Sequence, residues 1–357
     1  MKEPGALVSA AYVNTIGAPA ILQAMGSSES RIQTGITPRY GVASYKLTYY
    51  TVDESGAAQL ASGLVSLPLK AAGAKSPLLS YQHATTFKDA FAPTNKVEAV
   101  EPPIVLSSLG YIVLSPDYVG FGASKGVEHP YLTSTPTARA VIDLLTAAQT
   151  WRSQNGVADN GQLFLAGYSE GGYATMAAQR AIELAGGALK TQLQATVPGA
   201  GPYDVQETLD DQLRRVRAAN PVLGALLSPG WLRYAGDTVR NEVRRLLLRQ
   251  MLPEDSDVAY QTLFLDRYMA DDKTAIARDH SVHLGWVPSV PVHLFHGRGD
   301  QTVPFTASES ALRTLLAAGA RQVTLTECSD PTANHTACVP EYFRFAVGRM
   351  GLLARDL

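Results

Sequence analysis

Short apolar segments bounded by turn residues recur along most of the chain and predict buried strands. Stretches with apolar positions at helical spacing lie between or after several of these segments and predict helices. The predicted strands are residues 77–82, 111–114, 163–166, 195–198, 292–295 and 323–325, and the predicted helices are residues 135–151, 171–184, 307–318 and 342–353. This alternation predicts an α/β fold with a mostly parallel, doubly wound sheet.

Two regions depart from the alternation. Residues 45–52 and 62–69 alternate apolar and polar positions and contain many aromatic and β-branched residues, which predicts a leading antiparallel hairpin. Residues 203–284 lack a strand pattern, while leucine, arginine and acidic residues repeat there at helical spacing. We therefore expect a core of residues 1–202 and 285–357, interrupted by a helical insertion. The arginines of the insertion are interleaved with acidic residues, which predicts a solvated helix face rather than a site for an anionic substrate.

Composition narrows the class of protein. The chain has 357 residues, of which 46% are hydrophobic and 17% are charged, so it can bury a large core and is neither disordered nor fibrous. The 30 Lys and Arg residues against 32 Asp and Glu residues give a net charge of −2. That balance predicts no nucleic-acid partner.

The N-terminal region bears on cellular location. Residues 5–26 carry little charge but are interrupted by polar residues, Gly17 and Pro19, so we expect no transmembrane segment. They also lack the basic start and continuous apolar run of a signal peptide. The chain is therefore predicted to be intracellular, or exported with its leader removed.

The two cysteines help to decide between those locations. Cys328 and Cys338 lie in one polar loop with nine residues between them. We interpret them as a short-loop disulfide, which favours an oxidising compartment and hence a secreted or periplasmic protein. The alternative is two separate buried thiols in a cytosolic protein.

Residues 167–171 have the sequence Gly-Tyr-Ser-Glu-Gly and join a predicted strand to a predicted helix. This is the G-x-S-x-G pattern in the strand-turn-helix context that its chemistry requires. The flanking glycines allow a sharp turn that exposes the Ser169 hydroxyl, and the Glu170 N–H at the helix start is positioned to stabilise an oxyanion. The alternative is a glycine-rich turn without catalytic function.

A serine nucleophile needs a histidine base and an acid, in the chain order Ser, Asp or Glu, His. Asp300 follows the predicted strand 292–295, and His335 follows the last predicted strand. We therefore predict Ser169, Asp300 and His335 as a catalytic triad, with Asp330 as a rival acid. None of the other six histidines follows the last strand.

The loop after strand 77–82 is the predicted source of a second oxyanion donor. The Thr85 N–H is the first choice and the Ala84 N–H the second, while His83 is expected to order the loop by hydrogen bonding. Asp117, in a later glycine-containing loop, is expected to bind backbone N–H groups. The chain has no Cys/His cluster with metal-ligand spacing, so no metal or other cofactor is expected.

Together these residues resemble the α/β-hydrolase superfamily over about residues 75–345. A narrower resemblance is to the secretory lipase family and its bacterial esterase relatives. It rests on residues 4–7 (Pro-Gly-Ala-Leu), 81–83 (Tyr-Gln-His), 116–122 (Pro-Asp-Tyr-Val-Gly-Phe-Gly) and 129–132 (His-Pro-Tyr-Leu). This resemblance implies an exported carboxylic-ester hydrolase with a helical lid at residues 203–284 and a disulfide near the catalytic histidine. Ala84 departs from the family, in which glycine is frequent at this position.

The main prediction is thus a serine esterase or lipase that acts on small-molecule or lipid esters. One alternative is a serine peptidase with the same triad, in which Glu207, Asp210 and Asp211 would bind a free N-terminus. Another is a non-catalytic protein that uses the fold as a ligand pocket. Residues 226–232 and 246–248 of the insertion could form an apolar acyl site or could simply pack against the core.

Overall fold

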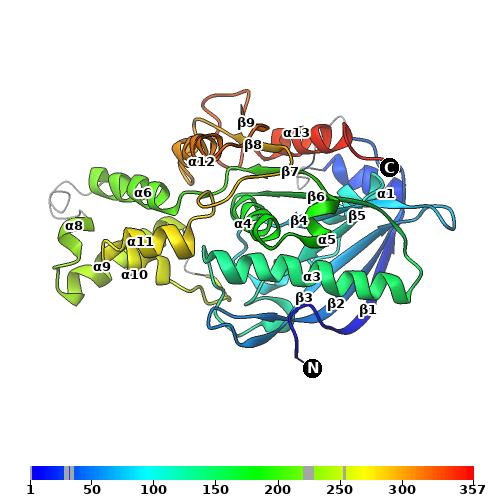
Figure 1. The fold of residues 1–357 in the computed structure, drawn as a ribbon, viewed down its shortest axis with the longest axis horizontal. Coiled ribbons are helices and arrows are strands. Elements are labelled where there is room, and N and C mark those ends of the chain that lie inside the picture. The colour runs from blue at the N-terminus through cyan, green and yellow to red at the C-terminus, as the bar shows by residue number, and fades with distance from the viewer. Residues whose placement is uncertain (1, 28–31, 33–35, 220–228, 252–254) are drawn as a thin grey trace.

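The computed structural model describes the whole chain except residues 1, 28–31, 33–35, 220–228 and 252–254 (Figure 1). The described residues form one nine-stranded sheet in the order β1-β2-β3-β5-β4-β6-β7-β8-β9. Its strands are β1 (Leu7–Ile16), β2 (Val42–Val52), β3 (Ala58–Pro68), β4 (Ser76–Gln82), β5 (Ile112–Pro116), β6 (Asp159–Tyr168), β7 (Leu193–Gly199), β8 (Val292–His296) and β9 (Val323–Glu327). Each predicted strand corresponds to one of these.

The sheet begins antiparallel and continues parallel. β1 pairs with β2, β2 with β3, and β3 with β5, all antiparallel, whereas the pairs from β5 through β4 to β9 are parallel. The predicted leading hairpin is confirmed as β2 and β3. The edge strand β1, which the sequence analysis did not predict, extends that hairpin to three strands.

Successive residues of the central strands enter different hydrophobic clusters, because side chains alternate across a sheet. Leu78 packs in the cluster that contains Leu144 of α3 (Ser134–Gln154), and Leu79 packs in the cluster that contains Ile104 of α2 (Pro102–Ser108). Helices α3 and α4 (Glu170–Ala185) thus cover one face of the sheet (Figure 1). The other face is covered by α1 (Ala18–Met25), α2 and α13 (Val339–Gly351).

The remaining core helices are α5 (Gly187–Gln192), α12 (Phe305–Ala317) and the short 3-10 turns η1 (Asp89–Phe91) and η2 (Gly122–Ser124). In the part of the chain that the structure describes, no helix is both long enough and apolar enough to cross a membrane.

The helical insertion joins β7 to β8 and lies to one side of the sheet (Figure 1). Its described elements are α6 (Val205–Ala219), α8 (Pro229–Leu232), α9 (Asp237–Met251), α10 (Leu263–Met269), α11 (Lys273–Ala275) and a π-helical turn, η3 (Ile276–His280). Most of its buried hydrophobic side chains share one cluster with residues of α4, β8 and α12. The insertion therefore packs directly on the core.

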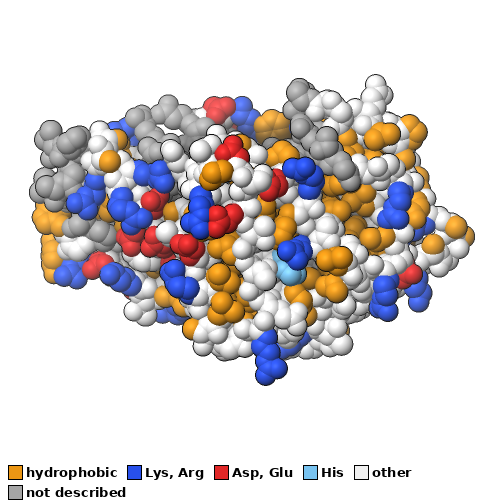
Figure 2. Space-filling model, turned by 90° about the horizontal axis from the view of Figure 1, so that it is seen from above, with side chains coloured by type: hydrophobic (Ala, Val, Ile, Leu, Met, Phe, Trp, Pro, Cys, Tyr) orange, Lys and Arg blue, Asp and Glu red, His pale blue; other side chains and the backbone are white. Residues whose placement is uncertain are grey.

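Charges of both signs are interspersed on the surface of the insertion, on the left in Figure 2. On α6, Arg214 and Arg215 both pair with Asp211, at 3.1 and 2.6 Å. On α9, Arg244 pairs with Asp266 of α10. These pairs agree with the predicted solvated helix face.

Candidate active site

Ser169 occupies a sharp turn between β6 and α4, with φ 61° and ψ −125°. Its N–H donates a hydrogen bond to the Gly199 carbonyl oxygen at 2.8 Å, which ties the turn to the end of β7. A Cβ at Gly171 would overlap the carbonyl oxygen of Gln82, and a Cβ at Gly167 would lie 2.6 Å from the same oxygen. The two glycines are therefore required because the turn lies directly against the end of β4.

The structure brings Ser169, His335 and Asp300 into one hydrogen-bonded chain. His335 Nε2 lies 2.8 Å from Ser169 Oγ, and His335 Nδ1 lies 2.5 Å from Asp300 Oδ2. The residues come from three separate loops, which follow β6, β8 and β9. Because parallel strands end at the same edge of a sheet, residues far apart in sequence meet there.

Asp300 is almost completely buried and holds four hydrogen bonds. His296 Nε2 lies 3.1 Å from the Oδ2 atom that also faces His335, while the N–H groups of Thr302 and Val303 donate to Oδ1 at 2.8 and 2.9 Å. Burial by itself raises the pKa of this carboxyl, but the hydrogen bonds from His296 and His335 outweigh it and hold the pKa well below its usual value. Asp300 is therefore a fixed negative charge beside His335.

The loop that carries His335 is held from two sides. The predicted disulfide between Cys328 and Cys338 is confirmed, with the two Cα atoms 5.9 Å apart. Tyr168 donates its hydroxyl hydrogen to the His335 carbonyl oxygen at 2.7 Å. The rival acid Asp330 is exposed and accepts hydrogen bonds from the Thr332 N–H and hydroxyl groups. It therefore stabilises a local turn of the same loop.

The predicted oxyanion loop adjoins this chain of three residues. His83 Nδ1 lies 2.8 Å from the Ala84 carbonyl oxygen, and the imidazole stacks on Tyr118 with ring centroids 4.2 Å apart. In a trans peptide the C=O and N–H groups point in opposite directions, so the Thr85 N–H points away from His83. Among the described residues, neither the Thr85 nor the Glu170 N–H has a hydrogen-bond acceptor. Both are available to a bound group.

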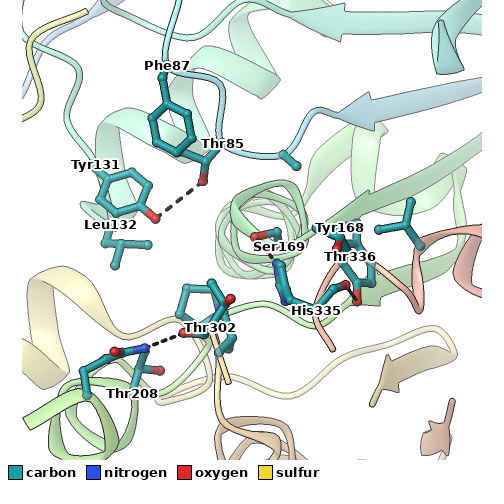
Figure 3. Close-up of a pocket in the computed structure, with 15 residues that line it drawn as sticks. Thr85, Phe87, Tyr131, Leu132, Tyr168, Ser169, Thr208, Thr302, His335 and Thr336 are labelled. Carbon is teal, nitrogen blue, oxygen red and sulfur yellow. Dashed lines mark hydrogen bonds between the residues drawn. The ribbon is translucent and has the colours of Figure 1, made fainter. Parts of the chain in front are cut away.

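A cavity of about 390 Å³ opens over Ser169 and His335. Figure 3 shows Thr85, Phe87, Tyr131 and Leu132 along one side of it and Thr208 and Thr302 along another. No carboxylate or cationic side chain is among its described lining residues. His335 is thus the only described lining residue whose side chain can carry a charge near neutral pH.

Two other predictions concern the insertion. Glu207, Asp210 and Asp211 do not line the cavity, and instead contact Thr306, Tyr268 and nearby arginines respectively. Of the two predicted apolar acyl segments, residues 226–228 lie outside the described residues. Leu232 and Leu247 are buried in the cluster that joins the insertion to the core. They pack as ordinary helix residues.

Several residues at the site were not predicted as functional, among them His296, Tyr168 and Gln212. His296 lies four residues before Asp300 at the end of β8, a spacing that could have suggested the contact. Gln212 of α6 donates to the Thr302 carbonyl oxygen at 2.6 Å and lines the cavity. No local signal in the sequence indicates that contact. Asp117 is completely buried and accepts the Thr94 N–H at 2.9 Å, as expected, and also the hydroxyl groups of Ser62 and Thr94.

In the described part of the chain, no group of three or more His, Cys, Asp or Glu side chains is arranged to hold a metal ion.

Comparison with solved structures relates this arrangement to known proteins. A candidate hydrolase from Legionella pneumophila (lpg1103) superposes with a TM-score of 0.76 at 22% identity, with 97% of each chain covered. The rice cell wall degrading esterase LipA from Xanthomonas oryzae superposes with a TM-score of 0.71 at 24% identity, over 98% of this chain and 97% of LipA. The chain has the α/β-hydrolase fold. Candida antarctica lipase A shares the fold more distantly, with a TM-score of 0.57 at 16% identity over 93% of this chain and 78% of the lipase.

A comparison of the sequence with protein-family models gives a second result. Residues 98–211 match the family model of secretory lipases, which confirms the resemblance predicted from the motifs. The matched segment includes Ser169 and the loop of His129 and Tyr131. A comparison with curated protein sequences finds no significant match. The family match supports a hydrolase of the esterase and lipase class.

Proposed function

We propose that this α/β-hydrolase is a serine carboxylic-ester hydrolase that forms an acyl-enzyme at Ser169. The observation that carries the proposal is the hydrogen-bonded chain from Ser169 Oγ through His335 to Asp300 on the wall of the cavity. It has the geometry by which a histidine activates a serine hydroxyl.

In the acylation half of the reaction, Ser169 Oγ attacks the ester carbonyl carbon as its proton moves to His335 Nε2. The carbonyl oxygen becomes a tetrahedral oxyanion. When the C–O bond to the alcohol breaks, His335 Nε2 returns the proton to the leaving oxygen. The alcohol departs, and the acyl group remains bonded to Ser169.

In the second half, a water molecule attacks the acyl-enzyme carbonyl carbon and gives its proton to His335 Nε2. The second tetrahedral intermediate then releases the carboxylic acid, and the proton returns to Ser169 Oγ. Asp300 accepts the His335 Nδ1–H bond throughout, which fixes the ring orientation and stabilises the imidazolium formed in each half.

The N–H groups of Glu170 and Thr85 are the proposed oxyanion donors. Glu170 is the first residue of α4, where the helix dipole adds positive potential. Thr85 lines the cavity, and its N–H points away from the His83 side of the loop. Two fixed N–H donors of this kind stabilise charge that develops only in the transition state.

The insertion, residues 203–284, is proposed to act as a cap over this site. It contributes Thr208 and Gln212 to the cavity, and its Asp257 N–H bonds the Phe87 carbonyl oxygen at 3.0 Å on the opposite side. The disulfide and the secretory lipase match support an exported protein.

The test is hydrolysis of p-nitrophenyl esters from acetate to palmitate by the wild type and by Ser169→Ala. We expect the substitution to reduce kcat by at least about 10³-fold on every ester that the wild type cleaves. The chain-length optimum then separates an esterase from a lipase. A wild type inactive on all esters, or an active Ser169→Ala variant, contradicts the proposal.

A further inference from the structure

Glu170, next to the proposed nucleophile, has a buried acidic side chain. Its Oε1 lies 2.6 Å from Nε2 of His129, and the two side chains are 4% and 2% exposed. Neither residue belongs to the proposed triad. An isolated, ionised carboxylate at this depth would be strongly unfavourable. The question is therefore how the contact with His129 offsets this cost.

The hydrogen bonds of His129 determine how many protons the pair holds. His129 Nδ1 lies 2.8 Å from the Val119 carbonyl oxygen, which can only accept, so Nδ1 carries a proton. A neutral His129 would then present the bare lone pair of Nε2 to Glu170. A carboxylate cannot form a hydrogen bond to that lone pair at 2.6 Å, so a second proton lies between Nε2 and Oε1. The pair therefore has zero net charge, whichever atom holds this proton.

The surroundings of the pair are largely aromatic. The His129 ring meets Phe121 and Tyr260 edge to face, with ring centroids 5.2 and 5.1 Å apart. The titratable groups that sense the Glu170 charge come from each neighbouring segment, namely His83 after β4, Tyr118 after β5, Tyr131 after His129, Tyr173 on α4 and Tyr260 on the insertion. The tyrosines carry no positive charge, and burial lowers the pKa of His83, which disfavours its cationic form. None of these groups can therefore replace His129 as a cation.

We propose that His129 is a positioning residue that cancels the charge of Glu170 and holds the first turn of α4 in place behind the oxyanion site. The proposal rests on the ester hydrolase function proposed above. Glu170 contributes its backbone N–H to the oxyanion, and an uncompensated negative charge on the same residue would repel that oxyanion in a site of low dielectric constant. His129 removes this repulsion and leaves the N–H free to donate.

His129 also connects this turn to the insertion. Its N–H donates to the Ala259 carbonyl oxygen at 2.7 Å, and its carbonyl oxygen accepts from the Gln261 N–H at 2.9 Å. The Cβ that Gly120 lacks would lie 2.9 Å from the His129 Cβ, so the chain crosses closely over this residue. The backbone of His129 is therefore held by contacts that do not involve its ring. A substitution that replaces only the ring thus tests its effect on the charge of Glu170.

The experiment compares H129Q with the double variant H129Q/E170Q on the p-nitrophenyl ester that the wild type cleaves best. H129Q leaves an uncompensated carboxyl group, so kcat is expected to fall at least about tenfold with KM little changed. The loss should grow as the pH rises, because deprotonation of a carboxyl group that lacks a cationic partner adds the negative charge that repels the oxyanion. The double variant restores a neutral amide pair and should recover most of the lost kcat without the added pH dependence.

A purely packing role for His129 predicts a different result. In that case the double variant is as impaired as H129Q, and the loss is independent of pH, which would overturn the proposal. The proton between the two side chains is tested without any substrate, by the nitrogen chemical shifts of the His129 ring in the wild type and in E170Q. If the wild type does not hydrolyse esters, the proposed function fails. Nitrogen shifts typical of a neutral imidazole with an unbonded Nε2 would instead refute the shared proton itself.

Discussion

Residues with unusual backbone conformations surround the proposed active site. Tyr118, Ser169 and Ala200 all have positive φ angles, of 66°, 61° and 43°, and they follow three central strands of the sheet, β5, β6 and β7 respectively. Such conformations are costly for residues other than glycine and are maintained only where the surrounding structure enforces them. Here the Ser169 N–H bond to Gly199 and the close packing of Gly171 provide that constraint.

The three residues of the proposed triad could be predicted from the sequence because each lies in a loop at the end of a strand. Ser169, Asp300 and His335 could each be predicted from a strand pattern and the loop that follows it. His129, by contrast, does not follow the last strand, and its contact with Glu170 depends on a loop crossing that no local pattern encodes. A contact between two segments that are distant in the sequence can be predicted only once the fold is known.

Replacement of Asp300 by Asn tests its role. The amide cannot stabilise an imidazolium at His335, so kcat on p-nitrophenyl esters should fall by roughly 10³- to 10⁴-fold. Asp330→Asn is the matched control, because Asp330 is an exposed acid of the neighbouring loop and should leave kcat unchanged. Equal losses in the two variants would show that Asp300 is not the orienting acid.

The lowered pKa of Asp300 also predicts how stability depends on pH. A carboxyl whose pKa is lower in the folded than in the unfolded chain stabilises the fold above its unfolded pKa of about 3.9, and this contribution is lost as the pH falls through the folded value. The difference in unfolding free energy between wild type and Asp300→Asn should therefore shrink as the pH falls below about 4. Chemical denaturation at pH values above and below about 4 measures this difference. A difference that stays unchanged well below about pH 4, down to the acid limit of folding, would be inconsistent with the lowered pKa.

At the scale of elements, the sequence predicted every strand from β2 to β9 and the four main core helices. Among the elements that it did not predict, β1 and α2 were missed for opposite reasons. Most β1 side chains are exposed, so no apolar alternation marks this edge strand, whereas all seven residues of α2 are buried, so no amphipathic period appears. Periodicity detects elements with one buried face, and neither of these has one.

The disulfide loop is an element whose contribution can be measured. Closing a loop of about ten residues stabilises the folded chain by roughly 3 kcal/mol in the chain-entropy account. Reduction, or Cys328→Ser combined with Cys338→Ser, should lower the unfolding free energy by that order and reduce kcat, because His335 lies inside the loop. Denaturant unfolding with and without reductant, paired with ester hydrolysis, provides the measurement. Unchanged values of both would show that the loop is held without the bridge.

At the scale of the whole molecule, the cavity is formed jointly by core and insertion. The core contributes the loops after β4, β6, β8 and β9, and α6 of the insertion contributes Thr208 and Gln212. The sequence indicated that an insertion exists but not which of its side chains reach the site. Those contacts depend on how α6 packs against α12, where Ser310 donates to Asp204 at 2.7 Å.

The size of this shared cavity predicts substrate preference. Thr208→Phe adds a ring to the cavity wall, so esters with long acyl chains should lose more activity than acetate. We expect the ratio of kcat/KM for p-nitrophenyl octanoate to that for acetate to fall about tenfold. Ala218→Phe, on an exposed position of the same helix, is the control and should leave the ratio unchanged. A ratio that is the same in the Thr208 variant as in the wild type would place the acyl chain elsewhere.

The central claim is that Ser169 carries the acyl group, and trapping that intermediate tests it most directly. The wild type is mixed with p-nitrophenyl acetate, quenched in acid within the first turnovers and digested, and the peptides are mapped by mass spectrometry. We predict one acetyl group, on Ser169, which is absent from Ser169→Ala treated in the same way. An acetyl group on another residue, or ester hydrolysis that persists in Ser169→Ala without any acylated peptide, would contradict the account.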